Sequence, residues 1–317
     1  MKIYDYDKFE SCEDRLGTYG GQSGYKDSIK IGDDYWIIKY PKNTKSMNAV
    51  DISYTTAPLS EYIGSHVYEI LGYDVHETNL GIRNHKLVVA VRDFCEYSGQ
   101  LIEFRTLKNY ANDYLAEKLD ESFSSTSSSY SIQLEEVLLH LENNPLLLKI
   151  DGITERFWNQ IVVDSLIGNN DRNNGNWGLL QQKDGSRKLA PVYDNGAAFS
   201  NKAGDEKIKK MLDNEERLLS NIQNTVSCYC IDGKRMTFSK LLSYDNDGLK
   251  KAIIYNYPLI RDNLGNIKNM IYEIPREKDG IEVCSDVRKD FYYKLMELRT
   301  DLLLRPLYEK YTSDEAR

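Results

Sequence analysis

The segment from residue 153 to residue 196 most strongly limits what this chain can fold into. It opens with ITERFWNQIVVDSLIG, residues 153–168, in which apolar side chains recur at helical spacing over one wide face, so we predict a buried helix. The next stretch, GNNDRNNGN, ends at Asn176 and is too polar for a core and too compact for a linker. An Asn-rich surface turn has the same composition. The composition of the loop therefore does not distinguish a surface turn from a functional loop, and the flanking segments are needed to do so.

The bulk composition is that of an ordinary globular protein. The 317 residues are 41% hydrophobic and 28% charged, which suits two core-forming units or one bilobed domain. The net charge of −8 argues against a broad nucleic-acid-binding surface, which normally needs a basic face. No apolar run approaches the length of a bilayer span, and the N-terminal residues lack the apolar stretch of a signal peptide. We therefore expect a cytoplasmic protein that binds neither nucleic acid nor a membrane directly, with secretion by a dedicated route left open.

The cysteines do not follow a metal-binding pattern. Cys228 and Cys230 are close in sequence, but no second cysteine pair and no nearby histidine completes a zinc site. We expect reduced cysteines without a catalytic role.

The order of predicted elements indicates two lobes. Residues 27–31 and 35–41 read as strands joined by a turn at Gly32, residues 58–72 as a helix that starts at Pro58 and ends at Gly72, and residues 85–94 as a strand. After about residue 96 we expect mainly helices, interrupted by a hairpin of residues 176–180 and 189–194. This order predicts an α+β, bilobed fold, with residues 1–95 as one lobe, residues 96–317 as the other, and a ligand cleft between them.

The N-terminal lobe contains candidates for binding a nucleotide. Phosphoryl transfer from ATP needs a flexible backbone cover over the phosphates and a cation for their oxygens. The glycine-rich stretch GTYGGQSGYK, residues 17–26, is the candidate cover, although no Gly-Lys-Ser/Thr sequence closes it as in a Walker A loop. Lys39 is the candidate cation, and Glu61 on the following helix could hold it extended. An edge lysine and a solvent-facing carboxylate are the competing interpretations.

The C-terminal lobe supplies the remaining parts of such a site. Asp171 could accept a hydrogen bond from a substrate hydroxyl, while Asn176 and Asp194 offer hard oxygen ligands to Mg²⁺. The spacing Asp-x₄-Asn, then a hairpin, then Asp-x-Gly brings these three residues to one end of that hairpin. This spacing is the most specific signal in the sequence.

Asp171-x₄-Asn176 followed by Asp194-x-Gly196 is the catalytic-loop and metal-loop pattern of protein kinases. The longer sequence around these residues, LIGNNDRNNGNWGLL with LAPVYDNGAAF, resembles the HipA-like serine/threonine kinases and in particular their short, CtkA-type members. The resemblance extends from the glycine-rich stretch to about residue 200. Because only some sixteen residues precede the glycine-rich stretch, we expect the extra N-terminal subdomain of full-length HipA toxins to be absent.

The resemblance implies ATP and Mg²⁺ as cofactors and gives each candidate a role. Asp171 matches the catalytic aspartate, Asn176 and Asp194 match the metal ligands, and Lys39 matches the phosphate-binding lysine with Glu61 as its partner. The remaining nucleotide-binding candidates are Gly20, Gly21, Gln22, Ser23, Gly24, Arg92, Asp93 and Phe94. Two features depart from the family. Asn173 stands where the family usually has a histidine, two residues after the catalytic aspartate. The glycine-rich stretch does not cleanly match the family's Gly-x-Gln-x-Lys motif.

The function that the resemblance implies is phosphorylation of serine or threonine in a protein substrate. It also implies autophosphorylation, for which Ser23 and Ser28 are the nearest candidates, and a toxin role with an antitoxin-like partner. The serine-rich residues 122–131 are an alternative autophosphorylation segment or a mere spacer. Two other functions stay open: a phosphatidylinositol-type lipid kinase, and a pseudokinase that acts as a nucleotide-binding interaction module.

Overall fold

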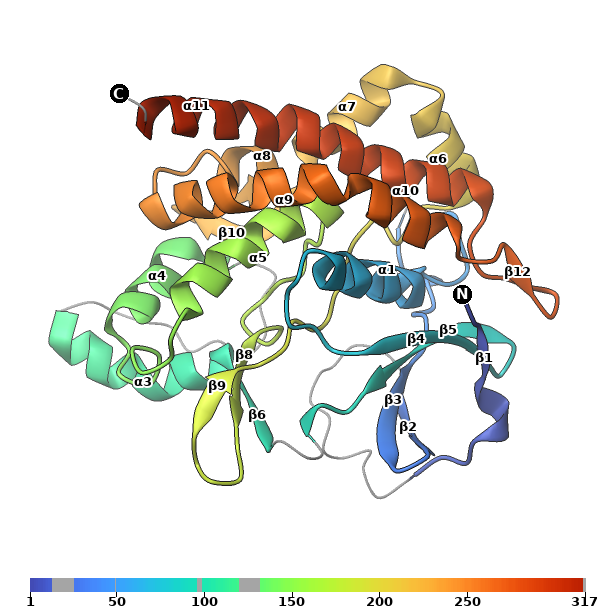
Figure 1. Cartoon of the computed structure of the whole chain (residues 1–317), viewed down its shortest axis with the longest axis horizontal. Helices are drawn as coiled ribbons and strands as arrows, with labels where there is room; N and C mark the ends of the chain where they lie inside the picture. The colour runs from blue at the N-terminus through green and yellow to red at the C-terminus, as the bar shows by residue number, and fades with distance from the viewer. Residues whose placement is uncertain (13–25, 49, 96–98, 120–131, 316–317) are drawn as a thin grey trace.

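The computed structural model describes residues 1–12, 26–48, 50–95, 99–119 and 132–315 (Figure 1). Before residue 96 these described residues form mainly strands and the helix α1, and after it helices dominate. In the described ranges, no helix combines the length and the apolar character needed to cross a bilayer.

The N-terminal part is a five-stranded sheet with the strand order β1-β4-β5-β3-β2. Its strands are β1 (Tyr4–Asp5), β2 (Lys26–Ile31), β3 (Asp34–Lys39), β4 (Thr78–Arg83) and β5 (Lys86–Arg92). All neighbours are antiparallel except β1 and β4, which are parallel. The turn between β2 and β3 contains Gly32, whose φ of 63° suits glycine. The strands predicted for residues 27–31 and 35–41 thus correspond to β2 and β3.

Helix α1 (Ala57–Ile70) lies between this sheet and the long helix α9 (Asp247–Tyr272) (Figure 1). Pro58 lies in its first turn, where the fixed φ of proline is suitable, and Gly72, with a φ of 80°, follows the C-cap residue Leu71. Leu59, Ile63 and Val67 are buried in the main core. The helix predicted for residues 58–72 is therefore present, and it contacts both parts of the chain.

The C-terminal part is mainly helical, with a small sheet beside the helices. Its other helices are α3 (Phe104–Leu119), α4 (Leu134–Asn143), α5 (Ile153–Ile167), α6 (Asp205–Leu212), α7 (Glu215–Asn224), α8 (Phe238–Leu241), α10 (Asp286–Arg299) and α11 (Arg305–Glu315). A π-helical turn, Thr300–Leu304, joins α10 to α11. The sheet has the order β6-β8-β9 and consists of β6 (Gln100–Glu103), β8 (Gly178–Gln181) and β9 (Arg187–Leu189). Strand β8 falls where the first strand of the hairpin was predicted, but its partner β9 precedes the predicted residues 189–194 and overlaps them only at Leu189. Strand β6 is an additional neighbour that the sequence pattern did not indicate. The proposed lobe boundary near residue 96 falls between β5 and β6.

Two further hairpins, which the sequence patterns did not indicate, interrupt the mainly helical remainder that was predicted. They are β10 (Val226–Ile231) with β11 (Lys234–Thr237), which β7 (Ile132–Gln133) extends, and β12 (Glu277–Lys278) with β13 (Ile281–Glu282). Each turns at an Asp-Gly pair with positive φ at both residues: 50° and 70° at Asp232 and Gly233, and 53° and 77° at Asp279 and Gly280. Positive φ at both central residues is typical of a type I′ turn, in which Asp-Gly is favoured.

Helix α5 ends where the Asn-rich loop begins, and its end is held by α10. Gly168 has a φ of 68°, and the Arg299 Nη1 group donates a hydrogen bond to the Leu166 carbonyl at 3.0 Å. A Cβ atom at position 168 would lie 2.7 Å from the Arg299 guanidinium, so both the backbone angle and the close approach require glycine. The loop that carries Asp171 therefore starts from a fixed point.

Candidate functional site

Lys39 links the two parts of the chain at the centre of the site. Its Nζ atom lies 3.2 Å from Oε1 of Glu61 on α1 and 3.0 Å from Oδ1 of Asp194, which follows the β8–β9 hairpin. Burial alone would lower the pKa of Lys39, but the charges of Asp194 and Glu61 outweigh it and raise that pKa above its ordinary value. Lys39 is thus a charged, inward-facing lysine and not an edge lysine.

Glu61 is a buried carboxylate, with 2% of its side chain exposed. Burial would raise its pKa, but Lys39 and then His76, whose Nε2 lies 3.0 Å from Glu61 Oε1, hold that pKa well below the ordinary value. Gly196 lets the chain after Asp194 approach Glu61, because a Cβ atom there would lie 3.0 Å from Glu61 Oε2. The interpretation of Glu61 as a solvent-facing carboxylate is therefore wrong.

The beginning of α1 is fastened to the segment after Asp194. The Ser60 hydroxyl donates to the Ala198 carbonyl at 3.1 Å, and the Thr56 backbone N–H donates to the Asn201 carbonyl at 2.8 Å. These bonds fix the helix that carries Glu61 against the loop that carries Asp194.

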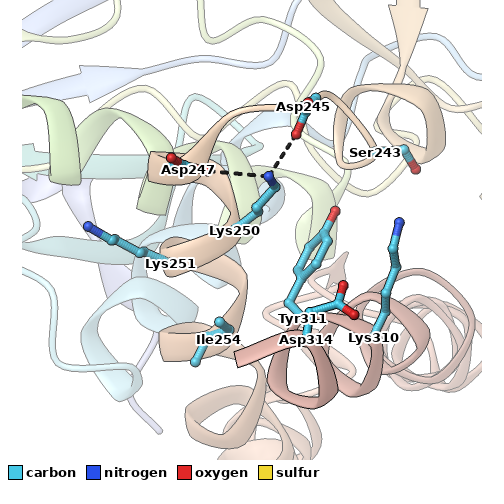
Figure 2. A pocket seen from close by; sticks show the side chains of 9 residues that line it. All are labelled: Ser243, Asp245, Asp247, Lys250, Lys251, Ile254, Lys310, Tyr311 and Asp314. Carbon is cyan, nitrogen blue, oxygen red and sulfur yellow. Dashed lines mark hydrogen bonds and ion pairs between the residues drawn. The ribbon is translucent and has the colours of Figure 1, made fainter. Parts of the chain in front are cut away.

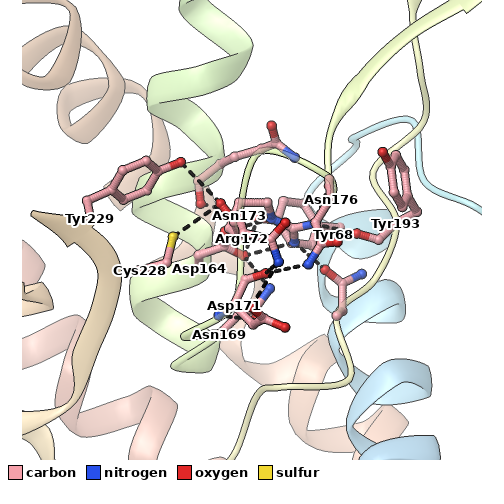
Figure 3. A network of polar contacts seen from close by, with 12 residues as sticks. Tyr68, Asp164, Asn169, Asp171, Arg172, Asn173, Asn176, Tyr193, Cys228 and Tyr229 are labelled. Carbon is pink, nitrogen blue, oxygen red and sulfur yellow. Dashed lines mark hydrogen bonds and ion pairs between the residues drawn. The ribbon is translucent and has the colours of Figure 1, made fainter. Parts of the chain in front are cut away.

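Arg172 organises the loop that follows α5 (Figure 3). Its side chain is 2% exposed and forms a bidentate ion pair with the equally buried Asp164 of α5, at 2.9 and 3.1 Å. Burial would lower the pKa of Arg172, but Asp164 raises it well above the ordinary value. Its Nη1 group donates to the carbonyl of Asn176, at 3.1 Å, and to that of Tyr193. A single buried arginine therefore holds the backbone beside both proposed metal ligands.

Asp171 lies on the same loop and is partly enclosed (Figure 3). The Asn173 amide donates to Asp171 Oδ1 at 2.9 Å, and the Asn176 amide nitrogen donates to the Asp171 carbonyl. Burial raises the pKa of the Asp171 carboxyl, the hydrogen bond from Asn173 lowers it, and the charge of Asp194 adds to the increase. Asp171 and Asn176 are thus in contact, and Asp194 lies close enough for its charge to act on Asp171.

The backbone at Asp194 has a φ of 63°, in the left-handed region that few residues other than glycine adopt. Such a conformation persists only where the surroundings hold it. Here the residues on either side, Tyr193 and Asn195, both accept hydrogen bonds from Arg172.

The proposed adenine-binding residues lie at the end of β5. The Arg92 guanidinium pairs with Asp34 at 2.8 Å, and the Asp93 backbone N–H donates to the Tyr35 carbonyl at 2.9 Å. The ring of Phe94 lies 5.8 Å from the ring of Tyr193. Phe94 is therefore the one of the three whose side chain is shown to approach the Asp194 loop. Gly20, Gly21, Gln22, Ser23 and Gly24 lie outside the described residues.

The sequence reasoning missed the polar residues that support this site. His76, Ser65, Asn195, Asp164 and Arg172 are not among the residues predicted for the site. A signal existed for Asp164, because an acidic residue in the apolar run IVVDSLIG needs a buried partner. The sequence carried no comparable signal for His76 or Ser65.

A separate concavity of about 550 Å³ lies between the start of α9 and the end of α11 (Figure 2). Its Lys250 is paired with Asp245 at 2.7 Å and Asp247 at 3.3 Å. None of the residues discussed above lines it, so it is distinct from the candidate site.

Comparisons with known proteins show what this chain is similar to. No family model matches the chain. The serine/threonine-protein kinase CtkA of Helicobacter pylori strain J99 is 29% identical over 294 residues, which cover 90% of this chain and 82% of CtkA. The crystal structure of a Helicobacter pylori proinflammatory kinase CtkA matches with a TM-score of 0.81 and 26% identity, over 98% of this chain and 99% of that one. By sequence and by structure, this chain is similar to CtkA, a serine/threonine-protein kinase.

A more distant structure has the same fold. The HipA–HipB toxin–antitoxin complex with operator DNA from Shewanella oneidensis MR-1 matches with a TM-score of 0.51 and 11% identity, over 97% of this chain and 75% of that one. At that identity the match shows the fold alone. The predicted α+β, kinase-like fold and the predicted relationship to CtkA-type kinases are both confirmed.

Proposed function

We propose that this HipA-like kinase transfers the γ-phosphoryl group of Mg²⁺-bound ATP to a serine or threonine hydroxyl of a protein. The observation that carries the proposal is the contact of Lys39 with both Glu61 and Asp194. It joins the strand proposed to hold the phosphates to the loop proposed to hold the metal. A nucleotide that reaches Lys39 is therefore beside Asp194 as well.

The nucleotide would lie against the inner face of β3. Ile37 and Lys39 alternate onto the same face of the strand, and both are only half-buried. Lys26 is the cross-strand partner of Lys39, which adds a second lysine to that face. We propose that Lys39 contacts the phosphates, that residues 20–24 cover them, and that Arg92, Asp93 and Phe94 border the adenine.

Asp194 and Asn176 fit Mg²⁺ by their chemistry. Both offer hard oxygen atoms, which Mg²⁺ prefers. The Asn176 amide nitrogen is committed to the Asp171 carbonyl, so its amide oxygen is the atom available as a ligand. Bound Mg²⁺ would neutralise charge on the phosphate oxygens.

Asp171 is the proposed catalytic residue. Its carboxylate would accept a hydrogen bond from the acceptor hydroxyl and orient it for in-line attack. The amide of Asn173 steadies the carboxylate through its Oδ1 atom. Asn173 thus takes over, in this proposal, an orienting role at the position where the family usually has histidine.

Among the autophosphorylation candidates, the structure argues against Ser28. Ser28 lies in β2 with its side chain completely buried, so its hydroxyl is not accessible to a second active site. Ser23 and residues 122–131 lie outside the described residues and stay candidates. We also keep as proposals a cytoplasmic location and a toxin role with an antitoxin-like partner; growth arrest on expression, relieved by Asp171→Asn, would support the toxin role.

The test is a phosphoryl-transfer assay with matched variants. The purified chain is incubated with Mg²⁺ and γ-labelled ATP, with a generic protein acceptor, with phosphoinositide vesicles, or alone, and labelled amino acids are identified. We expect label on serine or threonine, reduced by a factor on the order of 10² or more in Asp171→Asn and Asp194→Asn. Label on the lipid alone would favour a lipid kinase. ATP binding without any transfer would favour a pseudokinase.

A further inference from the structure

Three buried polar side chains connect Glu61 to Arg172. The Nε2 atom of His76 lies 3.0 Å from Glu61 Oε1 and 3.0 Å from the hydroxyl oxygen of Ser65. The Asn195 amide nitrogen donates to the same hydroxyl at 3.0 Å, and the Asn195 amide oxygen accepts from Arg172 at 2.5 Å. We call His76, Ser65 and Asn195 the polar bridge.

The polar bridge is fully enclosed by protein. The exposed fractions of His76, Ser65 and Asn195 are 3%, 1% and 0%. Burial lowers the pKa of His76, so its ring is neutral, and its Nε2 atom must carry the proton because the Glu61 carboxylate can only accept. His76 therefore donates to Glu61, while Asn195 donates to Ser65 and accepts from Arg172, so replacing His76 or Asn195 leaves a buried group unsatisfied.

The two ends of the polar bridge are the residues that hold the proposed nucleotide site. At one end Glu61 binds Lys39, the proposed phosphate ligand. At the other end Arg172 binds the carbonyl groups of Asn176 and Tyr193, beside the two proposed metal ligands. The polar bridge thus joins the phosphate-binding strand to both loops of the opposite lobe.

The backbone around the polar bridge is shaped to keep it closed. The His76 N–H donates to the Val192 carbonyl at 3.0 Å, and the Val192 N–H donates to the Asp74 carbonyl at 2.8 Å. On α1, Gly64 leaves room for Asn195, because a Cβ atom at Gly64 would lie 2.8 Å from Asn195 Cβ. The segment before β4, the Asp194 loop and α1 therefore pack tightly against one another.

We propose that His76, Ser65 and Asn195 are positioning residues that set α1 in its nucleotide-binding position before any ligand arrives. The inference rests on the proposed function, because it treats Lys39 and Asp194 as nucleotide-binding residues. It adds that this kinase needs no separate event to bring Glu61 to Lys39. The polar bridge does so in the nucleotide-free chain.

The test compares two substitutions of His76 with a control on α1. His76→Phe keeps the ring shape but removes the donor, whereas His76→Gln places an amide nitrogen where Nε2 lies. His66→Phe is the matched control, because the His66 ring nitrogens face the Tyr62 carbonyl at 2.9 Å and the Glu69 carboxylate at 3.8 Å, outside the polar bridge. Each variant is measured for KM and kcat with ATP, and for amide hydrogen exchange of α1 without nucleotide.

For His76→Phe we expect a rise in KM for ATP of about 10-fold or more, as for the loss of a hydrogen bond to a buried charge. We also expect faster exchange in α1 of the nucleotide-free protein. His76→Gln should recover most of both losses, and His66→Phe should match the wild type. An active wild type whose His76→Phe variant keeps its KM and its α1 protection, or whose His76→Gln variant is no better than His76→Phe, overturns the positioning role alone. A wild type that transfers no phosphate refutes the proposed function, while the exchange data still report on the polar bridge.

Discussion

Asp194 Oδ1 and Lys39 Nζ lie 3.0 Å apart although 155 positions separate the two residues in the sequence. Both side chains are partly exposed, at 38% and 22%, so the pair itself adds little to stability. Its significance is positional. With Glu61 behind Lys39, the pair marks the point where the sheet lobe meets the loop of the helical lobe.

Replacing Lys39 should weaken nucleotide binding more than it weakens folding. We expect Lys39→Met to lower kcat/KM for ATP by a factor of about 10² or more, because the variant loses the proposed phosphate cation and leaves Glu61 with His76 alone. The control is Lys30→Met, since Lys30 is an exposed residue of β2 whose ammonium group lies over the ring of Tyr35. Steady-state kinetics decide the matter, and equal kcat/KM values for the two variants would show that Lys39 has no special role.

Asn173 should set the acidic limit of the pH–rate profile. The proposed base Asp171 must be ionised, so activity is lost as pH falls through its pKa. Burial raises that pKa and the Asn173 hydrogen bond lowers it, so Asn173→Ala should raise it further and move the acidic limb of kcat/KM to higher pH. The exposed neighbour Asn170 provides the control, and Asn170→Ala should leave the limb in place. A limb that stays put or moves to lower pH in Asn173→Ala contradicts the assignment of Asp171.

Arg172 should be essential to stability as well as activity. Arg172→Met leaves Asp164 as an unpaired buried charge, and we expect the free energy of unfolding to fall by about 3–5 kcal/mol. Arg187→Met is the control, because Arg187 is exposed and its guanidinium donates to the side chain of Gln181 at the surface. This variant should change that free energy by less than about 0.5 kcal/mol. Denaturant unfolding measures both. A loss below about 1 kcal/mol in Arg172→Met would mean that the pair is not the anchor of the loop.

Two helical glycines should respond in opposite ways to alanine. At the exposed Gly265 of α9 a Cβ atom meets nothing within 4 Å, so Gly265→Ala should stabilise the chain by up to about 1 kcal/mol. At Gly64 of α1 the Cβ atom would lie 2.8 Å from Asn195 Cβ, and overpacking should outweigh the helix preference, with a net loss of about 1–3 kcal/mol. The same unfolding measurement applies, and stabilisation by Gly64→Ala would show that α1 does not pack tightly on the Asp194 loop.

Local sequence patterns predicted the elements that carry the site. Alternation indicated β2 and β3, helical periodicity with Pro58 and Gly72 indicated α1, and the apolar run indicated α5. These features are local, because each depends on side chains within a few turns or one strand. The Asp-Gly pairs at residues 232–233 and 279–280 are an equally local signal for hairpin turns, but the segments around them have helical character, and the two hairpins were not predicted.

The polar bridge could not be predicted in the same way. His76, Ser65 and Asn195 come from a connecting segment, a helix and a loop, and their partners are set by tertiary packing. Nothing in the residues adjacent to His76 distinguishes it from a surface histidine. Lys39 and Glu61 are candidates because of their residue types and their order along the chain, whereas the groups that orient them become visible only in three dimensions.

The most direct test of the proposed nucleotide site is the Mg²⁺ dependence of ATP affinity, measured by titration calorimetry with Mg²⁺ and with a chelator. We predict that Mg²⁺ strengthens ATP binding to the wild type and to Asp171→Asn by about 10-fold or more, and that Asp194→Asn loses this gain while still binding metal-free ATP. The opposite result, an Asp194→Asn variant in which Mg²⁺ strengthens ATP binding as much as in the wild type, would contradict the convergence of Lys39, Asn176 and Asp194 on one metal-bound nucleotide.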